Sequence, residues 1–221
     1  HGSKAKIRAG FGLTEATGAV CLSPENQFGD GIIGAPFPDM RIKIVQPGTH
    51  DTAAVNEDGE ICVSGPLVMM GYLNDDAETA QTIRLHEDGL VWLHTGDMGH
   101  FGEDGMVYFS GRLKRMIVSS GYNIYPTFLE SIINSHEGVL TSTVIGIDHP
   151  YKGQVPKAFV VLQPGYKPGK KIEKEIRELL ERNVPIYALP AAYEFRDKLP
   201  TTLVGKVAFK KLEDEEKAKK K

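Results

Sequence analysis

Asp97 and Arg112, near the middle of the chain, are the residues whose types and spacing most clearly indicate binding chemistry. Asp97 ends a Thr-Gly-Asp triplet, and Arg112 follows fifteen residues later. A carboxylate just after such a turn can accept both hydroxyls of a ribose. A guanidinium brought back beside it can reach the same sugar, or its phosphate, with two donors. The pair therefore predicts a site for a sugar phosphate.

The segment between these two residues is a predicted β-hairpin. Residues 102–105, Gly-Glu-Asp-Gly, have the composition of a tight turn and lie between two short strand-like segments. After Arg112 the sequence changes from strand-rich to alternating helices and strands. We predict an α+β protein in which residues 1–111 are the C-terminal portion of a larger domain, a distorted antiparallel β-barrel with the edge of a sheet. Residues 112–221 are predicted to form a small α+β lid with a three-stranded sheet.

Hydrophobic periodicity predicts the individual elements. In the first part we expect antiparallel strands over 31–64, core positions for Met69 and Met70, and a helix over 76–86. In the second part we expect a hairpin over 116–125, helices from Pro126 and over 172–180, and short strands over 143–147, 158–162 and 193–195. The charged residues at the end of the chain are expected to fray.

Composition excludes several classes of function. The chain has 221 residues, 41% hydrophobic and 25% charged, and a net charge of −3, which gives no electrostatic reason to expect nucleic acid or an anionic membrane as partner. Cys21 and Cys62 do not make a disulfide framework, so a reducing cytoplasm is expected. No apolar run reaches the roughly 20 residues of a transmembrane segment. Because no methionine opens the chain, we expect a piece of a longer protein.

The segment Gly10–Glu15, Gly-Phe-Gly-Leu-Thr-Glu, is a second candidate for binding. Glycines on both sides of Phe11 would let its ring stack on a flat base. Thr14 offers a hydroxyl to a phosphate, and Glu15 offers a hard oxygen ligand to Mg²⁺. Taken alone, the hexapeptide is more simply a glycine turn before a helix.

Five sequence blocks in order resemble the adenylate-forming superfamily of acyl-CoA synthetases, luciferases and peptide-synthetase adenylation domains. They are GFGLTE, GEICVSGPLVMMGY, LHTGDMG, GRLKRMIVSSGYNIYP and LPTTLVGK. The block VSSGYNIYP followed by a helix is most similar to bacterial medium- and long-chain fatty acyl-CoA ligases. The resemblance implies a two-step reaction, in which ATP and a carboxylic acid give acyl-AMP and pyrophosphate before CoA takes the acyl group.

The resemblance also implies roles for the first block. Phe11 would flank the adenine, with Gly10 and Gly12 giving it room, although the family usually has tyrosine at this position. Thr14 would contact the α-phosphate, and Glu15 would hold Mg²⁺.

Further roles follow for the later blocks. Asp97 would take the ribose hydroxyls, Arg112 would assist at the ribose, and Lys114 would be the hinge of the lid. Lys206, after a glycine, would reach the site during adenylation, where an ammonium offsets the charge that builds on the α-phosphoryl group. Without the resemblance Lys206 is simply a surface lysine.

The acceptor of the acyl group remains open at this point. Ser120, Gly121 and Tyr122 resemble the CoA-ligase form, with Gly121 leaving space for the pantetheine arm, so CoA is the expected acceptor. A carrier-protein phosphopantetheine, or no thiol, are alternatives. The phosphate loop and acyl pocket of the family lie upstream of Glu15 and are not in this sequence, so we expect these residues alone to be inactive. A non-catalytic nucleotide-binding or docking module of the same fold is the alternative function.

Overall fold

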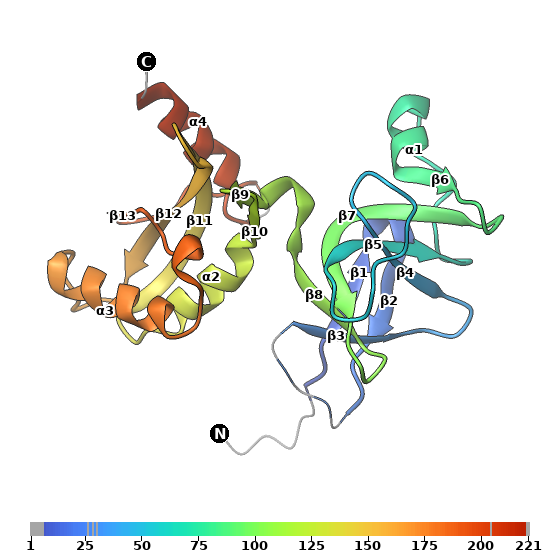
Figure 1. Ribbon diagram of the computed structural model, residues 1–221, viewed down its shortest axis with the longest axis horizontal. Coiled ribbons are helices and arrows are strands. Elements are labelled where there is room, and N and C mark those ends of the chain that lie inside the picture. The colour runs from blue at the N-terminus through green and yellow to red at the C-terminus, as the bar shows by residue number, and fades with distance from the viewer. Residues whose placement is uncertain (1–6, 26, 28, 30, 204, 220–221) are drawn as a thin grey trace. The chain divides into compact units, whose positions relative to one another are not determined.

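The computed structural model divides into two compact units, His1–Leu113 and Lys114–Lys221, which we call the first and second units (Figure 1). It describes residues 7–25, 27, 29, 31–203 and 205–219. These residues form two sheets and four α-helices, which confirms the α+β class expected from the sequence. None of the four helices has both the length and the apolar character to cross a membrane.

The first unit is built on a sheet of eight strands. They are β1 (Gly10–Leu13), β2 (Gly18–Leu22), β3 (Ile32–Pro36), β4 (Arg41–Val45), β5 (Gly59–Ser64), β6 (Ile83–Leu85), β7 (Val91–Phe101) and β8 (Val107–Arg112). The paired order is β1-β2-β3-β8-β7-β5-β4, with β6 also on β7. Among the described residues this path is open, so the barrel expected from the sequence is corrected to an open sheet. Alternating strand patterns fit both architectures, and only the pairing distinguishes them.

The core of the first unit lies between the strands and their connections. It is formed by apolar side chains that alternate inward, among them Val20, Ile44, Ile61, Leu93 and Val107. Two short 3₁₀ turns, η1 (Thr14–Ala16) and η2 (Leu113–Arg115), follow β1 and β8 respectively.

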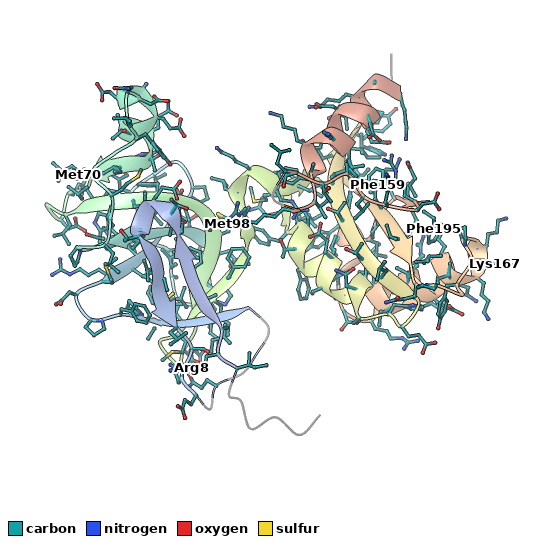
Figure 2. All side chains as sticks on the ribbon, turned by 180° about the vertical axis from the view of Figure 1, so that it is seen from behind. Arg8, Met70, Met98, Phe159, Lys167 and Phe195 are labelled. Atoms are coloured by element: carbon teal, nitrogen blue, oxygen red, sulfur yellow. The ribbon has the colours of Figure 1, made fainter. Side chains whose placement is uncertain are left out.

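Two expectations for the first unit are corrected. Helix α1 (Asp76–Thr82) begins as expected, with the Asp75 carboxylate accepting a hydrogen bond from the Glu78 N–H at 3.0 Å. It ends early, because the β-branched Ile83 starts β6 and pairs with β7 instead. Met70 is fully exposed rather than a core residue, and Figure 2 shows its side chain at the surface.

The second unit has a sheet of five strands rather than the three that the sequence predicted. They are β9 (Ile117–Ser119), β10 (Tyr122–Ile124), β11 (Val139–His149), β12 (Gly153–Leu162) and β13 (Ala192–Phe195). The paired order is β10-β9-β12-β11, and β13 joins β12 in parallel. The additional strands come from the hairpin over 116–125, which was predicted as a hairpin but joins the sheet through the pair Gly153 and Ser119.

Helices cover both faces of this sheet. The helices α2 (Pro126–Asn134) and α3 (Lys170–Glu181) bury Leu129, Ile133 and Ile176 against one face. A 3₁₀ turn, η3 (Ile186–Ala188), follows α3. On the other face, Phe159 of β12 packs with Leu212 and Phe209 of α4; Figure 2 labels Phe159.

Helix α4 (Phe209–Lys219) corrects the expectation that the chain end frays. Its sequence is mostly charged, but Leu212 is completely buried in the cluster with Phe159. Its Glu216 and Lys219 side chains also pair with Lys157 and Glu194 of the sheet, so apolar and ionic contacts together hold the helix.

Candidate functional site

Asp97 and Arg112 lie opposite each other in the β7–β8 hairpin. The Gly102–Gly105 turn closes this hairpin, with the Gly105 N–H donating to the Gly102 carbonyl at 3.0 Å. The Arg112 Nε lies 3.0 Å from the Asp97 Oδ1, so the side chains pair as well as the backbone. The predicted encounter of these two residues is therefore present, and the unit boundary after Leu113 places both in the first unit.

The triplet Thr95-Gly96-Asp97 is held rigidly from two sides. The Thr95 hydroxyl donates to the Ile61 carbonyl at 2.7 Å and accepts from the Asp97 N–H at 3.1 Å. Gly96 has φ of +69°, which disfavours any other residue. The Gly96 N–H donates to the Glu60 Oε1 at 2.9 Å, so the turn before Asp97 is fixed by β5.

Asp97 and Arg112 differ in their exposure to solvent. The whole residue Asp97 is 5% exposed, whereas the Arg112 side chain is 65% exposed. Burial raises the pKa of the Asp97 carboxyl, and the nearby Arg112 guanidinium only partly offsets this. Glu15 and Glu60 raise the Asp97 pKa further. A buried carboxylate whose cation reaches into solvent suits a polar ligand that brings its own hydroxyl donors.

Thr14 and Glu15 lie in η1, directly after β1. Thr14 is exposed, and the Tyr72 hydroxyl donates to the Glu15 Oε1 at 2.9 Å. The Glu15 carbonyl also accepts from the Met69 N–H at 2.8 Å. The segment 69–72 therefore fixes both the backbone and the carboxylate of Glu15. Burial is the main cause of a raised Tyr72 pKa, and the bond to Glu15 adds to it.

Core packing and the pairing of β1 with β2 constrain Phe11 and its two glycines. Phe11 is 9% exposed and packs in the core cluster of the first unit. A Cβ on Gly12 would lie 2.1 Å from the Gly18 carbonyl oxygen, so the β1–β2 contact itself requires glycine at this position. A Cβ on Gly10 would meet the Cys21 carbonyl at 3.2 Å, a tight contact.

The remaining predicted residues belong to the second unit. Lys114 is its first residue and lies in η2. Ser120 and Gly121 form the two-residue turn between β9 and β10, with φ of +52° and +85°, which is the pattern of a type I′ turn. Tyr122 follows, is half exposed, and stacks on Tyr187 with ring centroids 4.2 Å apart.

Lys206 lies on a narrow exposed loop. The Gly205 N–H donates to the Thr202 carbonyl at 3.0 Å, and the Thr202 N–H donates to the Lys206 carbonyl at 2.7 Å. Gly205 has φ of +79°. The loop is therefore a tight turn that presents the Lys206 side chain to solvent.

Sequence reasoning missed Glu60 and Tyr72, which hold Gly96 and Glu15 respectively. Burial alone would raise the pKa of Glu60, but hydrogen bonds from His94 and the Gly96 N–H lower it. The sequence signal for Glu60 was a charged residue in an otherwise apolar strand, which usually has a buried partner.

Comparison with known proteins identifies the family. The family model described as AMP-binding enzyme matches residues 1–73, and the model described as AMP-binding enzyme C-terminal domain matches residues 129–206. The long-chain-fatty-acid–CoA ligase of Bacillus subtilis is 41% identical over 214 residues, which is 96% of this chain and 36% of that protein. The chain thus spans about a third of the length of the relatives that it matches.

Solved structures give the same result. The o-succinylbenzoate CoA synthetase of Bacillus subtilis, in complex with its acyl-adenylate intermediate, superposes with a TM-score of 0.81 at 30% identity over 95% of this chain and 41% of that one. The amide bond synthetase of Marinactinospora thermotolerans superposes with a TM-score of 0.80 at 27% identity over 94% of this chain and 41% of that one. With both family models matched in order, the chain belongs to the AMP-binding family of adenylate-forming enzymes.

Proposed function

We propose that this chain supplies part of the nucleotide site and the mobile lid of an ATP-dependent acyl-CoA ligase. In the first step an oxygen of the carboxylic acid attacks the α-phosphorus of ATP, and pyrophosphate leaves. In the second step the sulfur of CoA attacks the acyl carbon, AMP leaves, and the thiol proton is released. The observation that carries this proposal is the buried Asp97 paired with the exposed Arg112 at 3.0 Å.

Asp97 and Arg112 would bind the ribose of the nucleotide. The Asp97 carboxylate accepts from the two ribose hydroxyls, and hydrogen bonds to a charged acceptor are worth about 1.5–3 kcal/mol each. Arg112 keeps Asp97 ionised and reaches the sugar with its remaining donors. The rigid Thr95-Gly96 turn supports this role because it fixes the carboxylate before the ligand arrives.

Glu15 fits the Mg²⁺ ion that ATP chemistry requires. Its carboxylate is half buried and is oriented by the Tyr72 hydroxyl on one oxygen. Mg²⁺ in nucleotide sites is commonly bound by only one or two carboxylates, phosphates and water. The ion, when bound, neutralises negative charge on the phosphates. Thr14, exposed beside it, would donate its hydroxyl to a phosphate oxygen.

Lys206 would supply a positive charge during adenylation, in addition to that of Mg²⁺. The tight turn at Gly205 keeps its loop narrow, which suits entry into a closed site. Lys114, at the start of the second unit, would be the residue about which the lid turns, and the Ser120–Tyr122 turn would lie along CoA.

The acid is proposed to be a fatty acid, because the long-chain ligase of Bacillus subtilis is 41% identical. A second candidate reaction is transfer of the acyl group to an amine, because the amide bond synthetase of Marinactinospora thermotolerans has a similar fold at 27% identity. Thioester formation with CoA, set against amide formation with a panel of amines, distinguishes the two. We propose a cytoplasmic enzyme.

The proposal is tested in the complete enzyme with Lys206→Ala. Acyl-AMP formation, followed by pyrophosphate release, should fall about 100- to 1,000-fold or more, because one preorganised charge donor is removed. Thioester formation from presupplied acyl-AMP should be spared. The exposed Lys210→Ala is the matched control and should leave both steps unchanged. Equal loss of both steps in the Lys206 variant would contradict the proposed role.

A second experiment concerns the isolated chain. We expect no pyrophosphate release with any acid in a panel of fatty acids, because the phosphate loop and acyl pocket of the family are not in this sequence. Acid-dependent release by the isolated chain would show that a complete site is present without them.

A further inference from the structure

Three histidines gather in the first unit, and none of them is proposed to contact the nucleotide. His50 lies in the loop after β4, His86 directly after β6, and His94 within β7. One ring nitrogen of each lies within 4.8 Å of one nitrogen of each of the others. We propose that His50, His86 and His94 bind one divalent transition-metal ion such as Zn²⁺, in a site that is independent of the proposed catalytic Mg²⁺.

The arrangement of His94 is typical of a metal ligand. Its Nδ1 lies 2.8 Å from the Glu60 Oε2, and since a carboxylate accepts, Nδ1 carries the proton. The lone pair is then on Nε2, the atom that faces the other histidines. Metal-binding histidines nearly always donate their second ring N–H to a carboxylate, a carbonyl or water in this way, which fixes the ring and its tautomer.

The His86 Nε2 faces the His94 Nε2 at a distance close to that between two nitrogen ligands of one metal ion. The His86 Nε2 lies 3.0 Å from the His94 Nε2. Two nitrogens bound tetrahedrally to Zn²⁺ at about 2.0–2.1 Å are roughly 3.3 Å apart, so the rings need to separate by only a few tenths of an ångström. Both residues are buried, which holds the pair in place.

His50 supplies the third ligand from solvent. It is exposed, and its ring stacks on His86 with centroids 3.9 Å apart and planes inclined by 8°. A rotation of this exposed side chain brings a nitrogen toward the other two. Three imidazoles with water in the fourth position make an open site, and imidazole selects ions such as Zn²⁺, Ni²⁺ or Cu²⁺ over Mg²⁺.

Lys43 opposes metal binding and so gives a sensitive test. Its Nζ lies 3.4 Å from the His86 Nδ1 and 2.6 Å from the Asp88 Oδ2. Without metal, Lys43 donates to His86 Nδ1, and His86 Nε2–H donates to His94. With metal on Nε2, the His86 proton moves to Nδ1, so the Lys43 ammonium must turn away toward Asp88. Removing this cation should therefore tighten binding.

The experiment is a titration of the full chain, stripped with a chelator and free of any added histidine tag, with Zn²⁺ by calorimetry and with Co²⁺ by visible spectroscopy. One ion per chain should bind, with the absorption of tetrahedral Co²⁺, and excess Mg²⁺ should not displace it. His50→Ala, at an exposed position that does not threaten folding, should weaken binding at least about tenfold, and Glu60→Gln about 10- to 100-fold. Lys43→Met should tighten it.

His100 provides the matched control. It pairs with Asp58 at 2.8 Å within the same unit but outside the cluster. His100→Ala should bind the metal like the unmodified chain, with folding of each variant checked by circular dichroism. The proposal is overturned if the unmodified chain binds no ion, if His50→Ala and Glu60→Gln bind it as tightly as the unmodified chain does, or if His100→Ala weakens binding as much as they do.

Discussion

The two units surround a carboxylate with cations in opposite ways: Asp97 is buried, whereas Glu194 is half-buried. In the first unit, Asp97 has one cation beside it, Arg112, whose side chain is 65% exposed. In the second unit, Glu194 receives Lys157 at 2.8 Å, Arg196 at 2.7 Å and Lys219 at 3.1 Å. Burial raises the pKa of Asp97, whereas the three cations overcome burial and lower the pKa of Glu194 to about 2.

The difference sets the proposed nucleotide site apart from a structural network. At neutral pH the ionised Asp97 destabilises the folded first unit, because a raised folded-state pKa means that ionisation is easier in the unfolded chain. The Glu194 network stabilises the second unit at the same pH. Carboxylates whose pKa is raised by burial are common at ligand sites, which supports the proposed role of Asp97.

The sharpest way to break this comparison is Asp97→Asn in the complete enzyme. The loss of two hydrogen bonds to a charged acceptor should lower kcat/KM for adenylation about 100- to 10,000-fold. The melting temperature of the first unit should stay the same or rise, because a buried charge is removed. The exposed Glu103→Gln is the control and should change neither quantity. A melting temperature that falls along with activity would make Asp97 a structural residue instead.

Leu212→Ala tests how the second unit holds its network. Leu212 is the fully buried residue of α4, and the same helix supplies Glu216, which lies 2.8 Å from Lys157. The cavity should lower the free energy of unfolding by about 2–5 kcal/mol, measured by urea denaturation. Leu203→Ala, at a fully exposed position, should change it by less than about 0.5 kcal/mol. Equal effects would mean that α4 is not held by this contact.

The contrast between α4 and the predicted elements shows what the sequence could reveal. Helix α3 was predicted because Ile172, Ile176 and Leu180 repeat at helical spacing, and all three are buried. Helix α4 has one buried leucine among charged residues, so its periodicity is too weak to recognise. Its partners in the sheet include Lys157, which pairs with Glu216, and no local pattern identifies such partners.

The same limit applies to the candidate sites. Asp97 and Arg112 were predicted to meet because a short hairpin joins them, and local turn composition determined that contact. The histidine cluster was not predicted, because the rings of His50, His86 and His94 meet only through the pairing of β6 with β7 and the placement of a loop. Contacts between residues far apart in sequence depend on strand register, which composition does not specify.

The stability of the second unit at acid pH tests the contribution of Glu194. The folded-state pKa of Glu194 is lowered from an ordinary value of 4.5 to about 2, so its stabilisation is present above pH 4.5 and is lost as pH falls toward 2. The second unit should lose on the order of 2 kcal/mol over this range. Urea denaturation at several pH values should show a flatter profile for Glu194→Gln. An unchanged slope in that variant would place the acid sensitivity in other carboxylates.

The smallest expected effect is that of alanine at two glycines of the second unit, and it distinguishes a loss of stability from a loss of contact with CoA. Gly121 and Gly165 have φ of +85° and +95°, and a Cβ at either position would have open space. Alanine at each should therefore lower stability by a similar amount, roughly 1 kcal/mol, through backbone strain alone. Only Gly121→Ala should slow thioester formation in the complete enzyme, because only that turn is proposed to lie along CoA. If both variants slow the thiol step equally, strain in the second unit is the cause, and the turn makes no contact of its own with the acceptor.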